Sequence, residues 1–136
     1  MENKSILVID DNEDFLAFVL DFLILDMNIG EVIWAVSPEE AEEKMHLYNP
    51  GIVILDLGMK KLNGQEIANV ISKKEDSPII LMTSFYDNED YINLSRELGA
   101  DGFTLKDRFK ESLVELLNYL DTDRENIFKD KQFLLN

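Results

Sequence analysis

Short apolar runs alternate with longer amphipathic stretches along most of the chain. The clearest run is Ile52–Leu55, four apolar residues without polar alternation, and it leads directly into a carboxylate, Asp56. The run is too short for a helix and predicts a strand buried on both faces. In open α/β sheets, ligands bind at the carboxyl ends of such strands. Asp56 is therefore the first candidate functional residue.

Four further short apolar runs predict the other strands of a sheet, at Ser5–Ile9, Glu31–Val36, Ile79–Met82 and Phe103–Leu105. The stretches between and after the runs predict five helices, at about residues 13–27, 38–48, 64–74, 89–98 and 109–120. Ser37, Pro38 and Glu40 have the spacing of an N-cap, a first helical residue and a capping box. Asp87-Asn88 is the expected cap of the fourth helix.

Strict alternation of strands and helices predicts a parallel sheet with helices on both faces, because crossover connections are right-handed. Five such units in about 120 residues predict an α/β fold of the flavodoxin-like, doubly wound (βα)5 type, with strand order 2-1-3-4-5. We expect one domain over residues 1–121, followed by an extension or linker over residues 122–136.

Composition narrows the kinds of chemistry available. The 136 residues are 46% hydrophobic and 30% charged, as in ordinary globular domains. The absence of cysteine excludes disulfides, thiol catalysis and thiolate metal sites. The only histidine, His46, lies among polar neighbours and is expected on the surface.

The net charge and the hydropathy of the chain argue against nucleic acid as a partner and against a membrane-spanning segment. The net charge of −15 repels phosphate backbones, so we expect no direct binding of nucleic acid by this segment. The longest apolar tract, Phe15–Leu25, is interrupted by Asp21 and is too short to span a bilayer. No signal sequence is recognisable, so we expect a cytoplasmic protein without a membrane segment.

Polar residues with complementary chemistry follow four of the predicted strands. Asp10-Asp11 follows the first strand, Thr83 the fourth and Lys106 the fifth. In strand order 2-1-3-4-5 all of them meet Asp56 at one edge of the sheet. Three clustered carboxylates need a cation, and an all-oxygen ligand set suits Mg²⁺. Asp56 can then act as a nucleophile toward a phosphoryl group, with Lys106 neutralising charge and Thr83 binding a phosphoryl oxygen.

This arrangement resembles the receiver domain of two-component response regulators, over Ser5 to about Leu120. The matching residues are Asp10-Asp11, Asp56 with Met59 and Gly64 at the family spacing, Thr83-Ser84, and Lys106 with Phe103 three residues before it. Each match alone carries little information, but together they follow the family order on the predicted strand ends.

The resemblance implies that Asp56 is phosphorylated by a histidine kinase or a phosphotransfer protein. It implies a Mg²⁺ site of Asp10, Asp11, Asp56 and the backbone carbonyl of Gly58. Thr83 and Phe103 are the implied switch, which would shift the helix 4–strand 5–helix 5 face toward a downstream protein or an output domain. No enzymatic activity is implied beyond the protein's own phosphorylation and dephosphorylation, and a homodimer stays open.

The chain departs from the family pattern at three places. Lys60 and Asp107 stand where proline is usual. The proline after the lysine usually follows a cis peptide bond, which costs roughly 2.5–4 kcal/mol before any other residue. Phe85, two residues after Thr83, and Gly58 cannot orient a water molecule, so we expect slow loss of the phosphoryl group.

Two other functions are compatible with parts of the pattern. A degenerate receiver that only binds other proteins would retain the fold, and the substitutions at Lys60 and Asp107 are compatible with it. An aspartate-nucleophile phosphatase of the dehalogenase type would need a second acid two residues after the nucleophile, where this chain has Gly58.

The first predicted helix is apolar over more than one face. On a helical wheel, the face expected to pack on the sheet consists of Phe15, Phe18, Val19 and Phe22. An adjoining stripe of Leu16, Leu20, Leu23 and Ile24 is then left over, and we expect Leu16, Leu20 and Ile24 to contact a partner, such as the helical bundle of a kinase. The alternative is that the C-terminal segment, through Ile127-Phe128 and Phe133-Leu134, covers this stripe.

Overall fold

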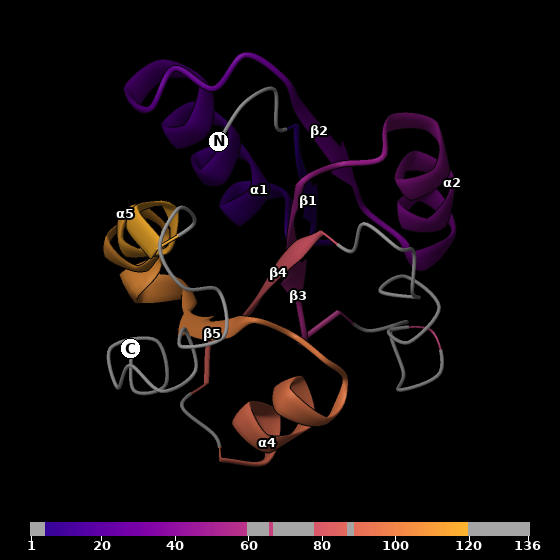
Figure 1. The fold of residues 1–136 in the computed structure, drawn as a ribbon, viewed down its shortest axis with the longest axis vertical. Coiled ribbons are helices and arrows are strands. Elements are labelled where there is room, and N and C mark those ends of the chain that lie inside the picture. The colour runs from indigo at the N-terminus through magenta and orange to yellow at the C-terminus, as the bar shows by residue number, and fades with distance from the viewer. Residues whose placement is uncertain (1–4, 60–65, 67–77, 87–88, 120–136) are drawn as a thin grey trace.

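The computed structural model describes residues 5–59, 66, 78–86 and 89–119 (Figure 1). Five parallel strands form one sheet in the order β2-β1-β3-β4-β5, which confirms the predicted topology. The strands are β1 (Ile6–Ile9), β2 (Val32–Ala35), β3 (Ile52–Asp56), β4 (Ile79–Ser84) and β5 (Gly102–Leu105).

The helices agree with the predicted ranges within a few residues. They are α1 (Glu13–Asp21), which continues as a π-helical segment η1 (Phe22–Asp26), then α2 (Pro38–Tyr48), α4 (Glu89–Glu97), the 3₁₀ segment η2 (Lys106–Arg108) and α5 (Phe109–Tyr119). The helix expected over residues 64–74 and the Asp87-Asn88 cap lie outside the described residues, apart from Glu66, which is helical. Among the described helices none is long and apolar enough to cross a membrane.

Each face of the sheet has its own apolar core, and Figure 1 shows α1 and α5 on the opposite side of the strands from α2. Alternate residues of the central strands serve the two cores, as a pleated strand requires. Val53 and Leu55 pack with residues of α2 and α4, whereas Ile52 and Ile54 pack with residues of α1 and α5. This explains the uninterrupted apolar run Ile52–Leu55, since every residue of β3 is buried.

The start of α2 follows the predicted capping pattern. The Ser37 hydroxyl accepts a hydrogen bond from the Glu40 N–H at 3.2 Å. The Glu40 carboxylate reaches back to the Val36 N–H at 3.4 Å. Asn49 ends the helix in the left-handed conformation, with φ of 46°.

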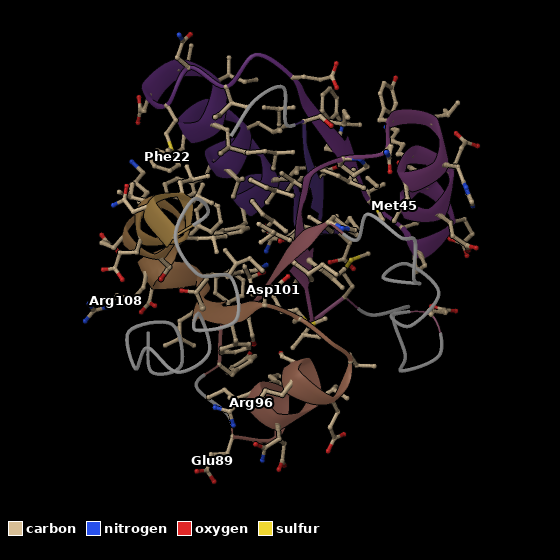
Figure 2. The ribbon with its side chains drawn as sticks, viewed as in Figure 1. Phe22, Met45, Glu89, Arg96, Asp101 and Arg108 are labelled. Carbon is tan, nitrogen blue, oxygen red and sulfur yellow. The ribbon has the colours of Figure 1, made fainter. Side chains whose placement is uncertain are left out.

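The prediction for the buried face of the first helix is wrong at Phe18, Leu16 and Leu23, since Leu23 is fully buried. Phe18 is 42% exposed, whereas Leu16 is only 6% exposed. Phe15 and Phe22, the latter labelled in Figure 2, both pack on Phe109 of α5, so one edge of the buried stripe faces that helix. Phe18 lies beyond this edge, where the Lys110 ammonium is 5.1 Å from the centre of its ring. This stripe consists of Phe15, Leu16, Val19, Phe22 and Leu23. Leu20 is half-buried, and Ile24 is exposed as expected.

Candidate functional site

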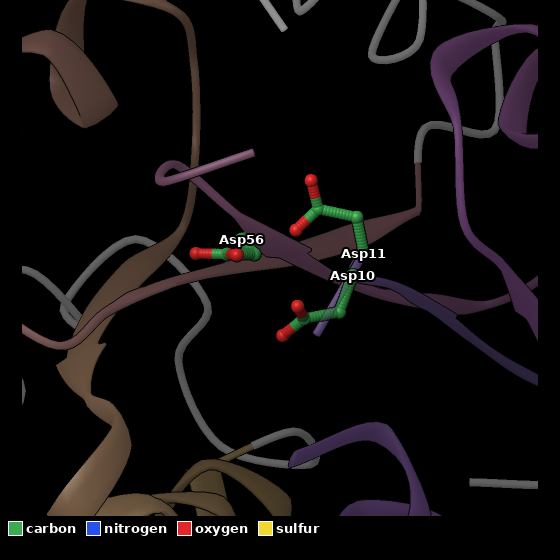
Figure 3. A group of neighbouring side chains, drawn as sticks. All are labelled: Asp10, Asp11 and Asp56. Atoms are coloured by element: carbon green, nitrogen blue, oxygen red, sulfur yellow. The ribbon is translucent and has the colours of Figure 1, made fainter. Parts of the chain in front are cut away.

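Three carboxylates lie together at the carboxyl ends of β1 and β3 (Figure 3). Asp10 and Asp11 follow β1, and Asp56 is the last residue of β3. One carboxylate oxygen from each lies within 4.8 Å of the others. Asp10 and Asp56 are buried, whereas Asp11 is exposed. The cluster therefore has two fixed carboxylates and one that faces solvent.

Lys106 completes the cluster from β5. Its ammonium lies 2.8 Å from Oδ2 of Asp10 and 3.2 Å from Oδ2 of Asp56, and its side chain is 1% exposed. The residue begins the η2 turn directly after β5. Its peptide bond with Asp107 is trans, since the described residues contain no cis bond.

Burial dominates the electrostatics of Asp10. The pKa of this carboxyl is raised from 3.8 to about 6, and loss of solvent around it is the largest cause. The charge of Asp56 also raises this pKa, whereas the hydrogen bonds from Lys106 and from the Asn12 N–H (2.9 Å) lower it. Because the largest contribution is desolvation, the site holds this negative charge at a cost. A bound cation would offset that cost.

Asp56 is oriented by the loop that follows it. Its Oδ1 accepts a hydrogen bond from the Gly58 N–H at 2.8 Å. A Cβ atom on Gly58 would come within 3.3 Å of the same oxygen, so glycine allows the loop to approach the carboxylate closely. The Leu57 N–H donates to the carbonyl of Thr83 at 2.9 Å, which joins this loop to β4.

Thr83 lies beside Asp56 in the sheet, because the two residues are register partners between β3 and β4. The Thr83 side chain is fully buried, and its hydroxyl donates to the carbonyl of Leu55 at 3.4 Å. This distance is longer than the usual range for a hydroxyl donor, so the bond is weak. The hydroxyl can therefore be redirected at little cost toward an oxygen that arrives at Asp56.

Phe103, the other predicted switch residue, is buried in the core on the α2 and α4 side of the sheet. It lies on β5 as the register partner of Met82, one residue before Thr83 on β4. Next to it, Thr104 and Ser112 share a buried hydrogen bond of 2.6 Å that links β5 to α5. The sequence pattern did not indicate this link, since two small hydroxyl residues eight positions apart carry no signal of contact.

The ligand set fits Mg²⁺. The clustered ligands Asp10, Asp11 and Asp56 offer carboxylate oxygens, which hard cations prefer. Three carboxylates against one ammonium leave two negative charges when all are ionised, which is the charge that a divalent cation balances. Asp10, Asp11 and Asp56 are the residues that would hold the ion.

Two aromatic rings beside Lys106 escaped the sequence interpretation. The Lys106 ammonium lies 4.4 Å from the centre of the Phe15 ring and 4.5 Å from that of Phe85. Phe15 was expected only in the core, and Phe85 was considered only for its lack of a polar group. The hydrophobic pattern cannot show these contacts with Lys106, because Phe15 lies on α1 and Phe85 lies in the loop after β4.

Comparison with known proteins identifies the same fold and family. The family model described as "Response regulator receiver domain" matches residues 6–118. The chain is 30% identical over 115 residues to the transcriptional regulatory protein DegU of Brevibacillus brevis, covering 84% of this chain and 49% of that protein. It is 38% identical over 106 residues to the probable transcriptional regulator ycf27 of Cyanophora paradoxa, covering 78% and 43%.

The chain thus spans about half of these curated relatives, or slightly less. Among solved structures, a signal receiver domain from Bermanella marisrubri superposes with a TM-score of 0.71 at 27% identity, covering 86% of this chain and all of that one. The matched region includes every strand and all four clustered charged residues. The chain belongs to the response regulator receiver domain family of two-component signalling.

Proposed function

We propose that Asp56 is the phosphoryl acceptor of this receiver domain, and that a histidine kinase or a phosphotransfer protein is the donor in the presence of Mg²⁺. The observation that supports this most strongly is the position of the Asp56 carboxylate. One oxygen lies 3.2 Å from the Lys106 ammonium and the other accepts the Gly58 N–H. Asp10 and Asp11 lie close enough to share a cation with it.

In the proposed reaction a carboxylate oxygen of Asp56 forms a bond to phosphorus while the donor's bond to phosphorus breaks and the leaving group takes up a proton. Mg²⁺ would neutralise charge on the transferred group. The Gly58 N–H and the Lys106 ammonium orient the carboxylate before the attack. Lys106 then balances charge on the phosphoryl oxygens, and the Thr83 hydroxyl donates a hydrogen bond to one of them. The Gly58 carbonyl is proposed as a further Mg²⁺ ligand.

The proposed output is a shift of the α4–β5–α5 face, driven by Thr83 and Phe103. Thr83 pairs with Thr104, the residue next to Phe103 on β5, and we propose that a movement of Thr83 reaches Phe103 through this strand. The receiving partner is a downstream protein or an output domain of the same chain. We propose that residues 1–121 form the signalling domain, that residues 122–136 form an extension, and that the protein acts in the cytoplasm without an external enzymatic substrate.

The proposed kinase-facing surface is smaller than the sequence indicated. Leu16 is buried and does not belong to it, Leu20 contributes its accessible part, and Ile24 is exposed. Ile24→Glu should therefore slow phosphorylation by any kinase or phosphotransfer protein that acts on the wild type. It should leave phosphorylation by a small phosphodonor unchanged. Leu47→Glu, at an exposed position of α2, is the matched control.

Intact-mass measurement after incubation with acetyl phosphate and Mg²⁺ tests the main proposal. The wild type should gain one phosphoryl group, Asp56→Asn should gain none, and a metal chelator should abolish the gain. If the wild type gains nothing, or gains the group without Mg²⁺, the proposal fails and the protein-binding function without phosphorylation becomes the better one.

A further inference from the structure

The Lys106 ammonium lies in a corner formed by two aromatic rings. The rings of Phe15 and Phe85 are 6.1 Å apart between centres and meet at 69°. The ammonium is 4.4 Å from one centre and 4.5 Å from the other, within the range at which a cation is attracted to a ring face. We call Phe15 and Phe85 the aromatic corner. It supplements the two carboxylates that already contact the same ammonium.

The two rings of the aromatic corner differ in how firmly they are held. Phe15 is buried and packs edge-to-face on Phe109 with ring centres 5.7 Å apart and an angle of 81°. Phe109 packs in turn on Phe22. Phe85, by contrast, is 58% exposed in the loop after β4. Phe15 is therefore held in place by the core, whereas Phe85 lies between the Lys106 ammonium and solvent.

Lys106 depends on such contacts for its position. A lysine side chain has four rotatable carbons and a compact charge that is strongly hydrated in water. The residue after it is Asp107, so no proline ring constrains the backbone at this point. The ammonium is nevertheless almost fully removed from solvent. Cation–π attraction is strongest under that condition, since water no longer competes for the charge.

We propose that the aromatic corner positions the Lys106 ammonium against Asp56, and that Phe85 keeps water from this contact. Phe85 thereby becomes a positioning residue for phosphoryl transfer, acting through Lys106. This role rests on the proposed function of Asp56, but the placement of the ammonium does not, and the two can be tested separately.

The placement is tested in the unphosphorylated protein by nuclear magnetic resonance. Protons next to the Lys106 ammonium should be shifted upfield by the ring currents, and their signals are identified by their loss in Lys106→Arg. Phe85→Leu keeps an apolar side chain but removes the ring, so these signals should move toward ordinary lysine positions. Phe85→Tyr keeps the ring and should retain the shift. Tyr86→Leu, which removes the neighbouring exposed ring, is the control.

The kinetic role is tested with acetyl phosphate and Mg²⁺. Phosphorylation of Phe85→Leu should be roughly tenfold slower, the rate equivalent of about 1.4 kcal/mol, which lies between the values for exposed and for desolvated cation–π contacts. Phe85→Tyr should restore most of the rate, and Tyr86→Leu should match the wild type. Urea unfolding of each variant verifies that the fold is kept.

Two results would overturn the inference. Unchanged Lys106 signals in Phe85→Leu would show that the ring does not place the ammonium. An unchanged rate in Phe85→Leu, or an equal loss in Tyr86→Leu, would show that the corner has no specific part in transfer. Failure of the wild type itself to be phosphorylated would refute the proposed function instead, and the resonance experiment would still decide the placement.

Discussion

Replacing Asp10 with asparagine tests the electrostatics of the carboxylate cluster through stability alone. The pKa of Asp10 is raised from 3.8 to about 6, mainly by burial. Between these values the native protein binds more protons than the unfolded chain, so its stability falls as the pH rises. The loss begins near the unfolded pKa and is complete above the folded one. Asparagine cannot ionise, and Asp10→Asn therefore avoids this loss.

The size of the effect follows from the same two values. Each unit of pKa difference corresponds to about 1.36 kcal/mol. Between pH 4 and pH 7 the free energy of unfolding of Asp10→Asn, relative to the wild type, should thus rise by on the order of 2–3 kcal/mol. Asparagine keeps only one of the two oxygens, so it can accept either the Asn12 N–H, which contacts Oδ1, or the Lys106 ammonium, which contacts Oδ2. Loss of the other contact lowers stability at every pH, whereas loss of the charge changes how stability depends on pH.

Urea unfolding at several pH values, with a metal chelator present, measures the difference. Asp21→Asn, an exposed position on α1, removes the same charge from the surface and should change stability by about 0.5 kcal/mol or less. Added Mg²⁺ should narrow the gap between Asp10→Asn and the wild type, because the ion stabilises the folded protein that binds it more tightly. A gap that is the same at pH 4 and pH 7, or that shrinks as the pH rises, would refute the reasoning.

Three further predictions concern other parts of the fold. The phosphorylated wild type should lose its group slowly in Mg²⁺, because neither Phe85 nor Gly58 carries a group that orients water, and a half-life of seconds by intact mass would contradict this. Phe103→Ala should lower the free energy of unfolding by about 3–5 kcal/mol, because it leaves a cavity in a closed core. Ser37→Ala should cost about 1 kcal/mol in urea unfolding through loss of the α2 cap, and an unchanged midpoint would show that the hydrogen bond is not needed.

The architecture could be predicted because both the strands and their connections leave a local signal. Short apolar runs such as Ile52–Leu55 stay buried on both faces and coincide with observed strands. The order of the strands then follows from the flavodoxin-like fold, which five such units in about 120 residues predict. Since every strand of a parallel sheet ends at the same edge, the sequence alone predicts that Asp56 lies close to Asp10 and Lys106.

What the sequence could not show depends on packing between helices. The helical wheel predicts one buried face for the first helix, but α5 contacts the edge of that face through Phe15 and Phe22, and the buried stripe extends to Leu16 and not to Phe18. The ring of Phe85 over Lys106 is a second example, because it joins a loop to a strand end more than twenty positions away. Periodicity describes one element at a time and carries no information on such neighbours.

Charge counting links the proposed phosphorylation to the proposed switch. With a divalent cation the three carboxylates and Lys106 are balanced. An aspartyl phosphate carries about two negative charges in place of one, so phosphorylation of Asp56 would leave one charge unmatched. A nearby hydrogen-bond donor whose present bond is weak can offset this charge. The Thr83 hydroxyl, at 3.4 Å from the Leu55 carbonyl, is such a donor, and its turn toward the phosphoryl group would vacate the space beside β5.

If the unmatched charge drives the switch through this hydroxyl, a Thr83→Val variant should accept the phosphoryl group without changing the α4–β5–α5 face. Backbone amide shifts of β5 that respond equally in the variant and the wild type would contradict it.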